Sequence, residues 1–226
     1  MSPELAFALS LADDADAISL SRFRTADLRV DTKPDLTPVS EADRAVENAL
    51  RKRLARDRPG EPVLGEEQGG DDTSGWIIDP IDGTRNYTRG IPIWATLIAF
   101  ADRVAVVSAP ALGRRWWASR GGGAYANGAR ISVSAIDRLE NATVLVALDR
   151  PAPPRAFTAW HLRSFGDFWA HMLVAEGAAE IAVDARGLAV WDMAAIRVIV
   201  EEAGGQFEDP VSSNGLFGGD LPLLRG

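Results

Sequence analysis

A nine-residue stretch, residues 76–84 (WIIDPIDGT), constrains this chain most, because it joins an apolar run to two acidic residues across a turn. The apolar residues 76–78 predict a short buried strand. Asp79-Pro80 is expected to end that strand, since proline has no N–H for the ladder and fixes its own φ. Asp82-Gly83 predicts a turn. We therefore expect both aspartates at the carboxyl end of a strand, where α/β sheets bind their ligands.

Two ionised aspartates held this close repel each other unless a cation lies between them. Their oxygen ligands favour Mg²⁺ or Mn²⁺ over softer metals. Acidic residues also follow other predicted elements: Glu66 and Glu67 come after the apolar residues 63–65, and Asp192 opens a helical pattern. Asp-Pro and Asp-Gly met alone are usually turn formers. Acids at several element ends instead predict a phosphatase site with more than one metal ion.

Composition narrows the class of protein. The 226 residues are 46% hydrophobic and 25% charged, which is ordinary for a globular chain with a sizeable core. The net charge of −8 disfavours a nucleic-acid partner. The absence of cysteine excludes disulfides and thiol chemistry. Because we find no signal peptide and no apolar run of membrane length, we expect a cytoplasmic protein without a membrane partner.

Apolar spacing and capping signals predict helices over residues 3–23, from Ser40 to about residue 57, over 168–177 and over 192–203. Residues 33–39 are expected to form a proline-broken connection. Strands are predicted at 63–65, 93–100, 104–108, 115–119, 130–133, 142–148, around 162, at 180–183 and near 207. Gly121-Gly122-Gly123 and Asn127-Gly128 predict hairpin turns. Layered α and β elements with hairpins in the middle indicate an α/β sandwich of sheets and helices.

These motifs together resemble a known superfamily. Gly65-Glu66-Glu67, residues 79–84, Trp191-Asp192 and residues 202–205 (EAGG) resemble the inositol monophosphatase superfamily, in order from Lys33 to Asn214. Within it, residues 31–39, 107–112, 114–117, 165–168 and 173–177 are most similar to the bacterial histidinol-phosphatase branch. The resemblance implies one phosphatase domain over residues 1–226. The proline cluster at residues 151–154 predicts a seam between the metal-bearing part, 1–150, and the substrate-side part, 151–226, which supplies Asp192.

The resemblance also implies a ligand set for two or three Mg²⁺ ions, with Mn²⁺ as an alternative. In it, Asp79 bridges two ions, Glu66 and the backbone carbonyl of Ile81 bind the first, and Asp82 and Asp192 hold the second. Water activated by one metal and a leaving oxygen stabilised by the other would then hydrolyse a phosphate monoester.

Three residues are expected to assist. Thr84 would orient the attacking water with Glu66, and the backbone N–H groups of Gly83 and Thr84 would hold phosphate. Glycine at position 83 lets the backbone approach the oxygens closely. The resemblance places Asp43 as the acceptor from Thr84; a helix cap is the alternative for this carboxylate, and both can hold at once.

Other charged residues keep two interpretations. Asp167 would bind the alcohol half of the substrate, or else cap a helix that starts at Phe168. Glu67 is expected to be salt-bridged or exposed rather than a ligand, and Lys33 lies either near the metal site or on the surface. His161 and His171 each lack a second nitrogen at ligand spacing, so they are not expected to bind metal.

The expected activity is hydrolysis of L-histidinol phosphate to histidinol and phosphate, in histidine biosynthesis, by a homodimer. An inositol monophosphatase or a broad sugar phosphatase is the alternative within the same class. The alternative from another class is a non-catalytic regulatory binding protein on the same fold. The connection around residues 148–165 is shorter than expected for the superfamily, which affects the substrate side more than the metal side.

Overall fold

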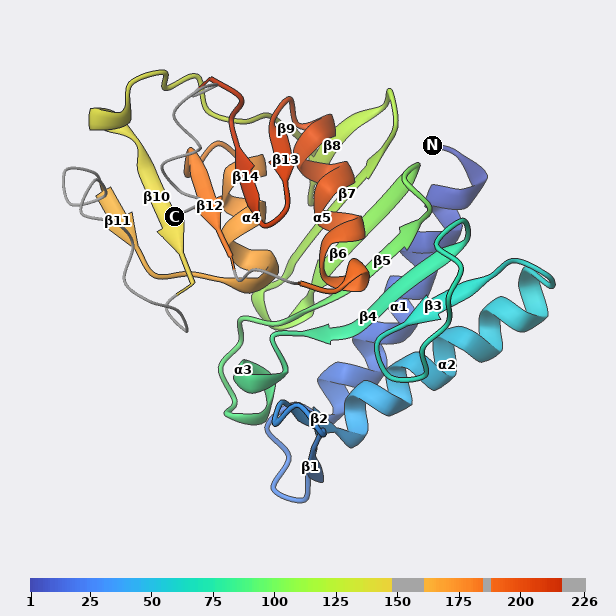
Figure 1. Ribbon diagram of the computed structural model, residues 1–226. Helices are drawn as coiled ribbons and strands as arrows, with labels where there is room; N and C mark the ends of the chain where they lie inside the picture. Colours follow the sequence, from blue (N-terminus) through green and yellow to red (C-terminus); the bar gives the residue numbers. More distant parts are fainter. Residues whose placement is uncertain (148–160, 185–187, 217–226) are drawn as a thin grey trace.

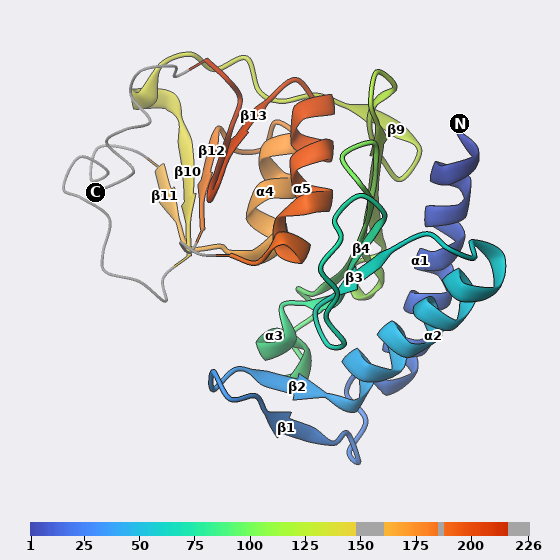
Figure 2. The ribbon, with the colours of Figure 1, turned by 45° about the vertical axis from the view of Figure 1, so that its right-hand side comes forward.

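The computed structural model describes residues 1–147, 161–184 and 188–216, in which sheets and helices alternate in layers. Helices α1 and α2 cover one face of a large sheet, and α4 and α5 cover the other face (Figures 1 and 2). A second sheet packs on the far side of α4. This arrangement confirms the predicted α/β sandwich.

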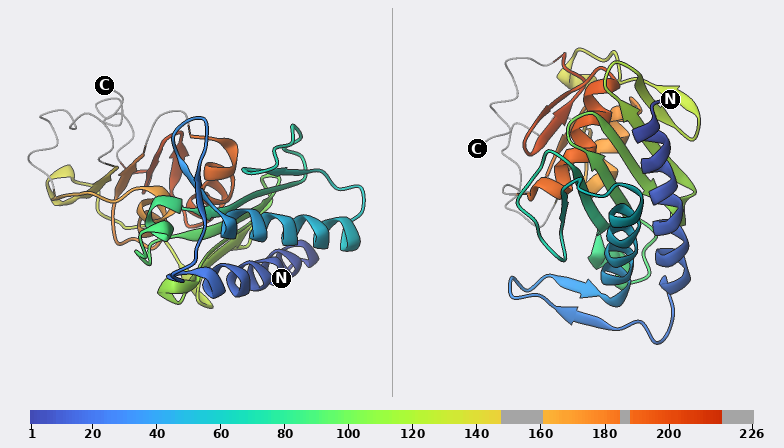
Figure 3. Two further views of the ribbon diagram at one scale, coloured as in Figure 1. Left: turned by 90° about the horizontal axis from the view of Figure 1, so that it is seen from below. Right: turned by 90° about the vertical axis from the view of Figure 1, so that its right-hand side faces the viewer.

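The first layer holds two helices that lie side by side (Figure 3). Helix α1 (Pro3–Arg22) begins after Ser2, whose hydroxyl accepts a hydrogen bond from the N–H of Leu5. Helix α2 (Glu41–Asp57) begins with a capping box between Ser40 and Asp43. Both helices confirm the predicted segments. Their apolar sides bury residues such as Leu11 and Leu50 against the sheet.

The large sheet has the strand order β3-β4-β5-β6-β7-β8-β9. Its strands are β3 (Val63–Gly65), β4 (Trp76–Asp82), β5 (Ala95–Phe100), β6 (Val104–Ala109), β7 (Arg114–Ser119), β8 (Gly123–Ala126) and β9 (Ala129–Ile131). Strands β3 and β4 are parallel and the other neighbours antiparallel. Alternate residues of β4 face opposite layers: Trp76 and Ile78 pack against α1 and α2, whereas Ile77 packs against α5.

Strand β4 corrects one prediction. It continues through Pro80 to Asp82, so the expected stop at Asp79-Pro80 is wrong. The pairing with β5 shifts there, because Asp79 faces Leu97 while Asp82 faces Ala95. One extra residue on β4 forms a bulge, and a bulge tolerates the missing N–H of proline.

The second sheet has the order β11-β10-β12-β14-β13 within the described residues. Its strands are β10 (Thr143–Val146), β11 (His161–Arg163), β12 (Ile181–Val183), β13 (Gln206–Glu208) and β14 (Val211–Ser213). Helices α4 (Asp167–Ala175) and α5 (Val190–Glu202) lie between the two sheets, and the short α3 (Thr84–Thr88) follows β4. Two single 3₁₀ turns, η1 (Pro110–Leu112) and η2 (Leu139–Asn141), lie in connections between strands.

Several strands differ from the prediction. Residues 30–40 contain an antiparallel hairpin, β1 (Val30–Thr32) with β2 (Pro38–Ser40), where only a connection was expected. Strands β8 and β14 were not predicted, and β9 is shifted toward the turn at Asn127-Gly128. The expected seam at residues 151–154 lies outside the described residues. No helix among the described residues has the length and apolar character needed to cross a membrane.

Candidate active site

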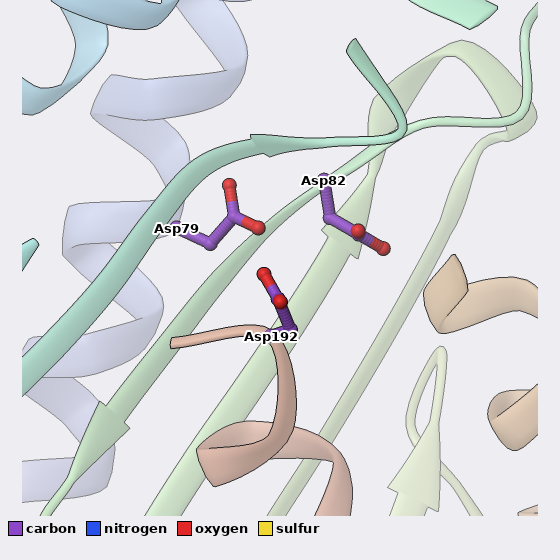
Figure 4. A group of neighbouring side chains, drawn as sticks. All are labelled: Asp79, Asp82 and Asp192. Carbon is purple, nitrogen blue, oxygen red and sulfur yellow. The ribbon is translucent and has the colours of Figure 1, made fainter. Parts of the chain in front are cut away.

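Three carboxylates converge where β4 ends and α5 begins (Figure 4). One oxygen each from Asp79, Asp82 and Asp192 lies within 4.8 Å of the others, the one such metal-competent group in the described part of the chain. Asp79 is only 1% exposed. The sequence analysis predicted that these three residues would meet.

The bulge in β4 makes this convergence possible. In a regular strand, residues three apart point to opposite faces, so Asp79 and Asp82 would diverge. The extra residue in the bulge returns Asp82 to the same side. Asp192 reaches the same point from the first turn of α5, where its Oδ2 accepts a 2.8 Å hydrogen bond from the N–H of Ala189.

The electrostatics of the cluster suit a cation. Burial, together with the charges of Glu66, Asp82 and Asp192, raises the pKa of Asp79 well above its usual range. Burial and the neighbouring acids likewise raise the pKa of Asp82, and they raise the pKa of Asp192 to about 7. Oδ1 of Asp79 is buried without a hydrogen-bond partner. A hard divalent cation would supply that partner and offset the repulsion.

Glu66 lies beside this group without belonging to it. Its charge raises the pKa values of Asp79 and Asp192, yet its Oε1 accepts a 2.7 Å hydrogen bond from Nζ of Lys33. The same ammonium group lies 2.6 Å from Oε1 of Glu67. Lys33 therefore lies at the site rather than on the open surface, and Glu67 is salt-bridged as expected.

The hydroxyl of Thr84 lies within hydrogen-bond distance of one backbone acceptor and one side-chain acceptor. It lies 2.9 Å from the carbonyl oxygen of Ile81 and 3.2 Å from Oδ1 of Asp43. The other oxygen of Asp43 accepts hydrogen bonds from the N–H and hydroxyl of Ser40. Both placements considered for Asp43 are thus present, one on each carboxylate oxygen.

Gly83 is required by its conformation and by the space around it. Its φ is +81°, in the left-handed region that favours glycine. An added Cβ would lie 3.0 Å from the carbonyl oxygen of Ile93 and 3.5 Å from Oδ2 of Asp167. A side chain at this position would therefore strain the backbone and crowd the carbonyl group of Ile93.

Asp167 is the first residue of α4, and Gly166 occupies the N-cap position. The φ of Asp167 is +55°, outside the helical range, so this residue lies at the boundary of the helix and both roles expected for it stay predictions. The N–H of Phe168 donates a 2.7 Å hydrogen bond to Oδ2 of Asp82. Asp167 lines a cavity of about 410 Å³ beside the carboxylate cluster.

Besides Asp167, that cavity contains Arg85, Asn86 and Ser164, which were not singled out from the sequence. Two aromatic side chains and several polar ones line it, including Phe165, Trp169, Arg85, Asn86, Ser164 and Asp184. Arg85 follows Thr84 directly, so its place in the motif was the available signal. His171 lies behind the cavity, buried, with Nδ1 2.7 Å from the hydroxyl of Ser212 and Nε2 3.6 Å from Oδ2 of Asp184.

Comparisons with known proteins agree with this geometry. The model of the inositol monophosphatase family matches residues 1–222. A histidinol-phosphatase of Mycobacterium tuberculosis is 48% identical, with 99% of this chain and 94% of that protein covered. A histidinol-phosphatase of Streptomyces coelicolor is 45% identical over 90% of this chain and 85% of its own length.

Among solved structures, the extragenic suppressor protein suhB of Bartonella henselae superposes with a TM-score of 0.87 at 28% identity. That comparison covers 99% of this chain and 98% of the other. The family model, the sequence relatives and the fold all give one assignment. The chain therefore belongs to the inositol monophosphatase family and is a phosphomonoesterase.

Proposed function

We propose that the protein hydrolyses L-histidinol phosphate to histidinol and phosphate, using Mg²⁺. The observation that carries this proposal is the pairing of Asp167 and Asp184 in one cavity beside the carboxylate cluster. The cavity is lined by these two acids and by one base, Arg85, so its charged side chains are acidic in excess, which favours a leaving group with a positive charge. Similarity to two proteins named histidinol-phosphatase supports the same substrate.

The metal ligands follow from the cluster. Glu66, Asp79 and the carbonyl of Ile81 would hold a first ion, and Asp79, Asp82 and Asp192 a second, with a third ion or Mn²⁺ as variants. Bound ions would supply an activated water and stabilise the charge that develops on the phosphate and the leaving oxygen. The buried, unpartnered Oδ1 of Asp79 supports its place between the ions.

The chain's own groups would direct the displacement. Glu66 and the Thr84 hydroxyl would orient the attacking water, with Asp43 accepting from Thr84. The backbone N–H groups of Gly83 and Thr84 would hold phosphate oxygens. The oxygen of the attacking water would bond to phosphorus as the bond between phosphorus and the alcohol oxygen breaks. A proton lost by the water would pass to the alcohol oxygen, which leaves as the alcohol. No residue becomes phosphorylated.

The cavity would bind the alcohol part of the substrate and select among substrates by its charge. Histidinol phosphate carries a protonated amine at neutral pH, which Asp167 and Asp184 would bind, and Trp169 offers an apolar surface for the imidazole. Inositol monophosphate carries only hydroxyl groups besides its phosphate, so the same acids would favour it less. We also propose that the enzyme is a homodimer, on the family resemblance; light scattering tests this.

Phosphate release tests the function directly. Histidinol phosphate, inositol monophosphate and fructose bisphosphate are compared with and without Mg²⁺. We expect Mg²⁺-dependent release, with kcat/KM at least about tenfold higher for histidinol phosphate, as one charge-assisted hydrogen bond allows. A preference for inositol monophosphate would instead identify an inositol monophosphatase. No release from any substrate would favour a regulatory binding protein.

A further inference from the structure

Helix α2 carries a polar ridge that the proposed mechanism uses only in part. Asp43, Glu47 and Arg51 recur every four residues and therefore share one face of the helix. Asp43 contacts Thr84. Glu47 is fully buried, and a buried carboxylate is costly unless it is paired and hydrogen-bonded.

The partners of Glu47 lie in the turn of residues 65–69, which carries Glu66. The carboxylate of Glu47 accepts hydrogen bonds from the N–H groups of Glu67 (2.7 Å) and Gln68 (3.1 Å). It also accepts one of 2.7 Å from Nε of Arg51.

Arg51 binds two backbone carbonyl groups, one in β3 just before the turn and one at the end of the turn. Its guanidinium donates to the carbonyl oxygens of Val63 at 3.3 Å and Gly69 at 2.5 Å. Glu47 thus satisfies N–H donors of the turn and Arg51 satisfies carbonyl acceptors, and the two side chains form an ion pair with each other. Hydrogen bonds from its N–H groups to Glu47 and from Arg51 to its carbonyl group therefore hold the turn against α2.

All N–H groups of the turn are accounted for. Gly65 and Gly69 exchange reciprocal backbone hydrogen bonds of 3.1 and 3.0 Å, and the N–H of Glu66 donates to the carbonyl of Ile78 at 3.2 Å. The two remaining N–H groups, those of Glu67 and Gln68, depend on Glu47. The approach is close enough that a Cβ at Gly65 would lie 2.3 Å from Oε1 of Glu47.

We propose that Glu47 is a positioning residue of the metal site. It fixes the turn of residues 65–69 so that the carboxylate of Glu66 faces Asp79. This inference rests on the proposed function, because it takes Glu66 as a metal ligand. Glu47 itself touches neither metal nor substrate.

Calorimetric titration of the full-length protein with Mg²⁺ tests the proposal without measuring turnover. Glu47→Gln keeps the shape but replaces one acceptor oxygen with a donor, so at least one of its three partners loses its bond. We expect the Kd for Mg²⁺ to rise at least about tenfold, as for other groups that orient metal ligands.

Glu202→Gln is the matched control. The Glu202 carboxylate also accepts from two turn N–H groups, those of Gly121 and Gly123, both at 2.9 Å, but at the hairpin between β7 and β8. It should lower the melting temperature and change the Kd for Mg²⁺ by less than about twofold. An equal change in Kd for both variants would overturn the proposal.

Loss of the Glu47 charge could itself weaken cation binding, and two further variants separate this effect from positioning. Gly65→Ala keeps every charge but forces the turn away from Glu47, so it should weaken Mg²⁺ binding to a similar degree. It also decides the question if Glu47→Gln does not fold. In a Glu66→Gln background, Glu47→Gln should add less than about twofold, because the ligand it positions is gone. An undiminished effect there would overturn the proposal.

Amide hydrogen exchange separates this inference from the proposed function. Without metal, Glu47→Gln should speed exchange at residues 67 and 68, whereas Glu202→Gln should speed it at 121 and 123. A wild-type protein that binds no Mg²⁺ contradicts the proposed function. Unchanged exchange at 67 and 68 in Glu47→Gln contradicts the anchoring of the turn, whatever the metal does.

Discussion

The N–H of Phe168 donates a 2.7 Å hydrogen bond to Oδ2 of Asp82, across 86 residues of sequence. A carboxylate at the end of β4 therefore binds the first turn of α4. This contact sets the start of α4 beside the carboxylate cluster. As a result Asp167, the preceding residue, lines the neighbouring cavity.

The first prediction concerns Asp82→Asn. The amide keeps an oxygen for the N–H of Phe168 but removes a charge from the cluster. Wild-type protein should melt at a higher temperature with Mg²⁺ than without, and the variant should lose about half or more of that increment. Its metal-free form should melt no lower than wild type, because the cost of burying the Asp82 charge and its repulsion with Asp167 and Asp192 are relieved. An unchanged metal increment in calorimetry would count against Asp82 as a ligand.

Asp79→Asn should have the larger effect on turnover. The substitution preserves shape but removes the charge that would bridge two cations. We expect kcat at saturating Mg²⁺ to fall at least about 10³-fold, a loss of several kcal/mol of transition-state stabilisation. Circular dichroism should show an unchanged fold. Turnover near that of wild type would rule out the bridging assignment.

The raised pKa values predict how metal-free stability depends on pH. The pKa of Asp192 is about 7 in the folded protein, against 3.8 for an unperturbed aspartate. The folded state then binds more protons than the unfolded state between these values, so stability falls as pH rises from about 4 to about 7. Above pH 7 Asp192 is ionised in both the folded and the unfolded state, so this group no longer changes the stability with pH.

Thermal unfolding in a chelator across this range checks the sign. The melting temperature should drop with rising pH, and Asp192→Asn should flatten part of the slope. Saturating Mg²⁺ should reverse it, because the metal binds the ionised carboxylates. A melting temperature that rises from pH 4 to 7 in the chelator would contradict the raised pKa.

Much of the site was predictable because its ligands follow a contiguous motif. The placement of Asp79 and Asp82 together at the end of a strand follows from residues 76–84. The route was different from the one expected, since Pro80 does not stop β4 but lies in a bulge. Local rules for proline cannot anticipate this, because the bulge depends on pairing with β5.

Other features could not be predicted from the sequence, because their causes are not local. All three residues of β1 are exposed, so the hairpin with β2 lacks the apolar alternation that marks a strand. Glu47 reads as an ordinary charged helix residue, because its burial arises only when the turn of residues 65–69 docks on α2. The cap formed by Asp43 was predictable because the capping box is local in sequence, whereas its contact with Thr84 was expected only from the family resemblance.

Thr84 offers a matched pair of substitutions. Its hydroxyl contacts the carbonyl of Ile81 and the carboxylate of Asp43. Thr84→Val keeps the shape without the hydroxyl and should lower kcat by about 10²-fold or more, within the range for a positioned proton-transfer group. Thr84→Ser keeps the hydroxyl and should retain most activity. Equal kcat values in steady-state assays of both variants would contradict a role for the hydroxyl.

Asp167→Asn tests whether the carboxylate of Asp167 binds the charged amine of the leaving group. The substitution removes one charge from the cavity and leaves Asp79, Asp82 and Asp192 in place. Charge-assisted hydrogen bonds contribute about 1.5–3 kcal/mol, so kcat/KM for histidinol phosphate should fall roughly 10- to 100-fold.

A generic phosphate ester without a cationic group serves as the control substrate for Asp167→Asn. It should lose little activity, because its hydrolysis needs only the carboxylate cluster. Equal losses for both substrates would mean that Asp167 supports the site as a whole, for example through the contact of α4 with Asp82. If neither substrate loses activity, the amine is bound elsewhere in the cavity. Asp184→Asn then becomes the deciding variant, since that carboxylate lines the same cavity in front of His171.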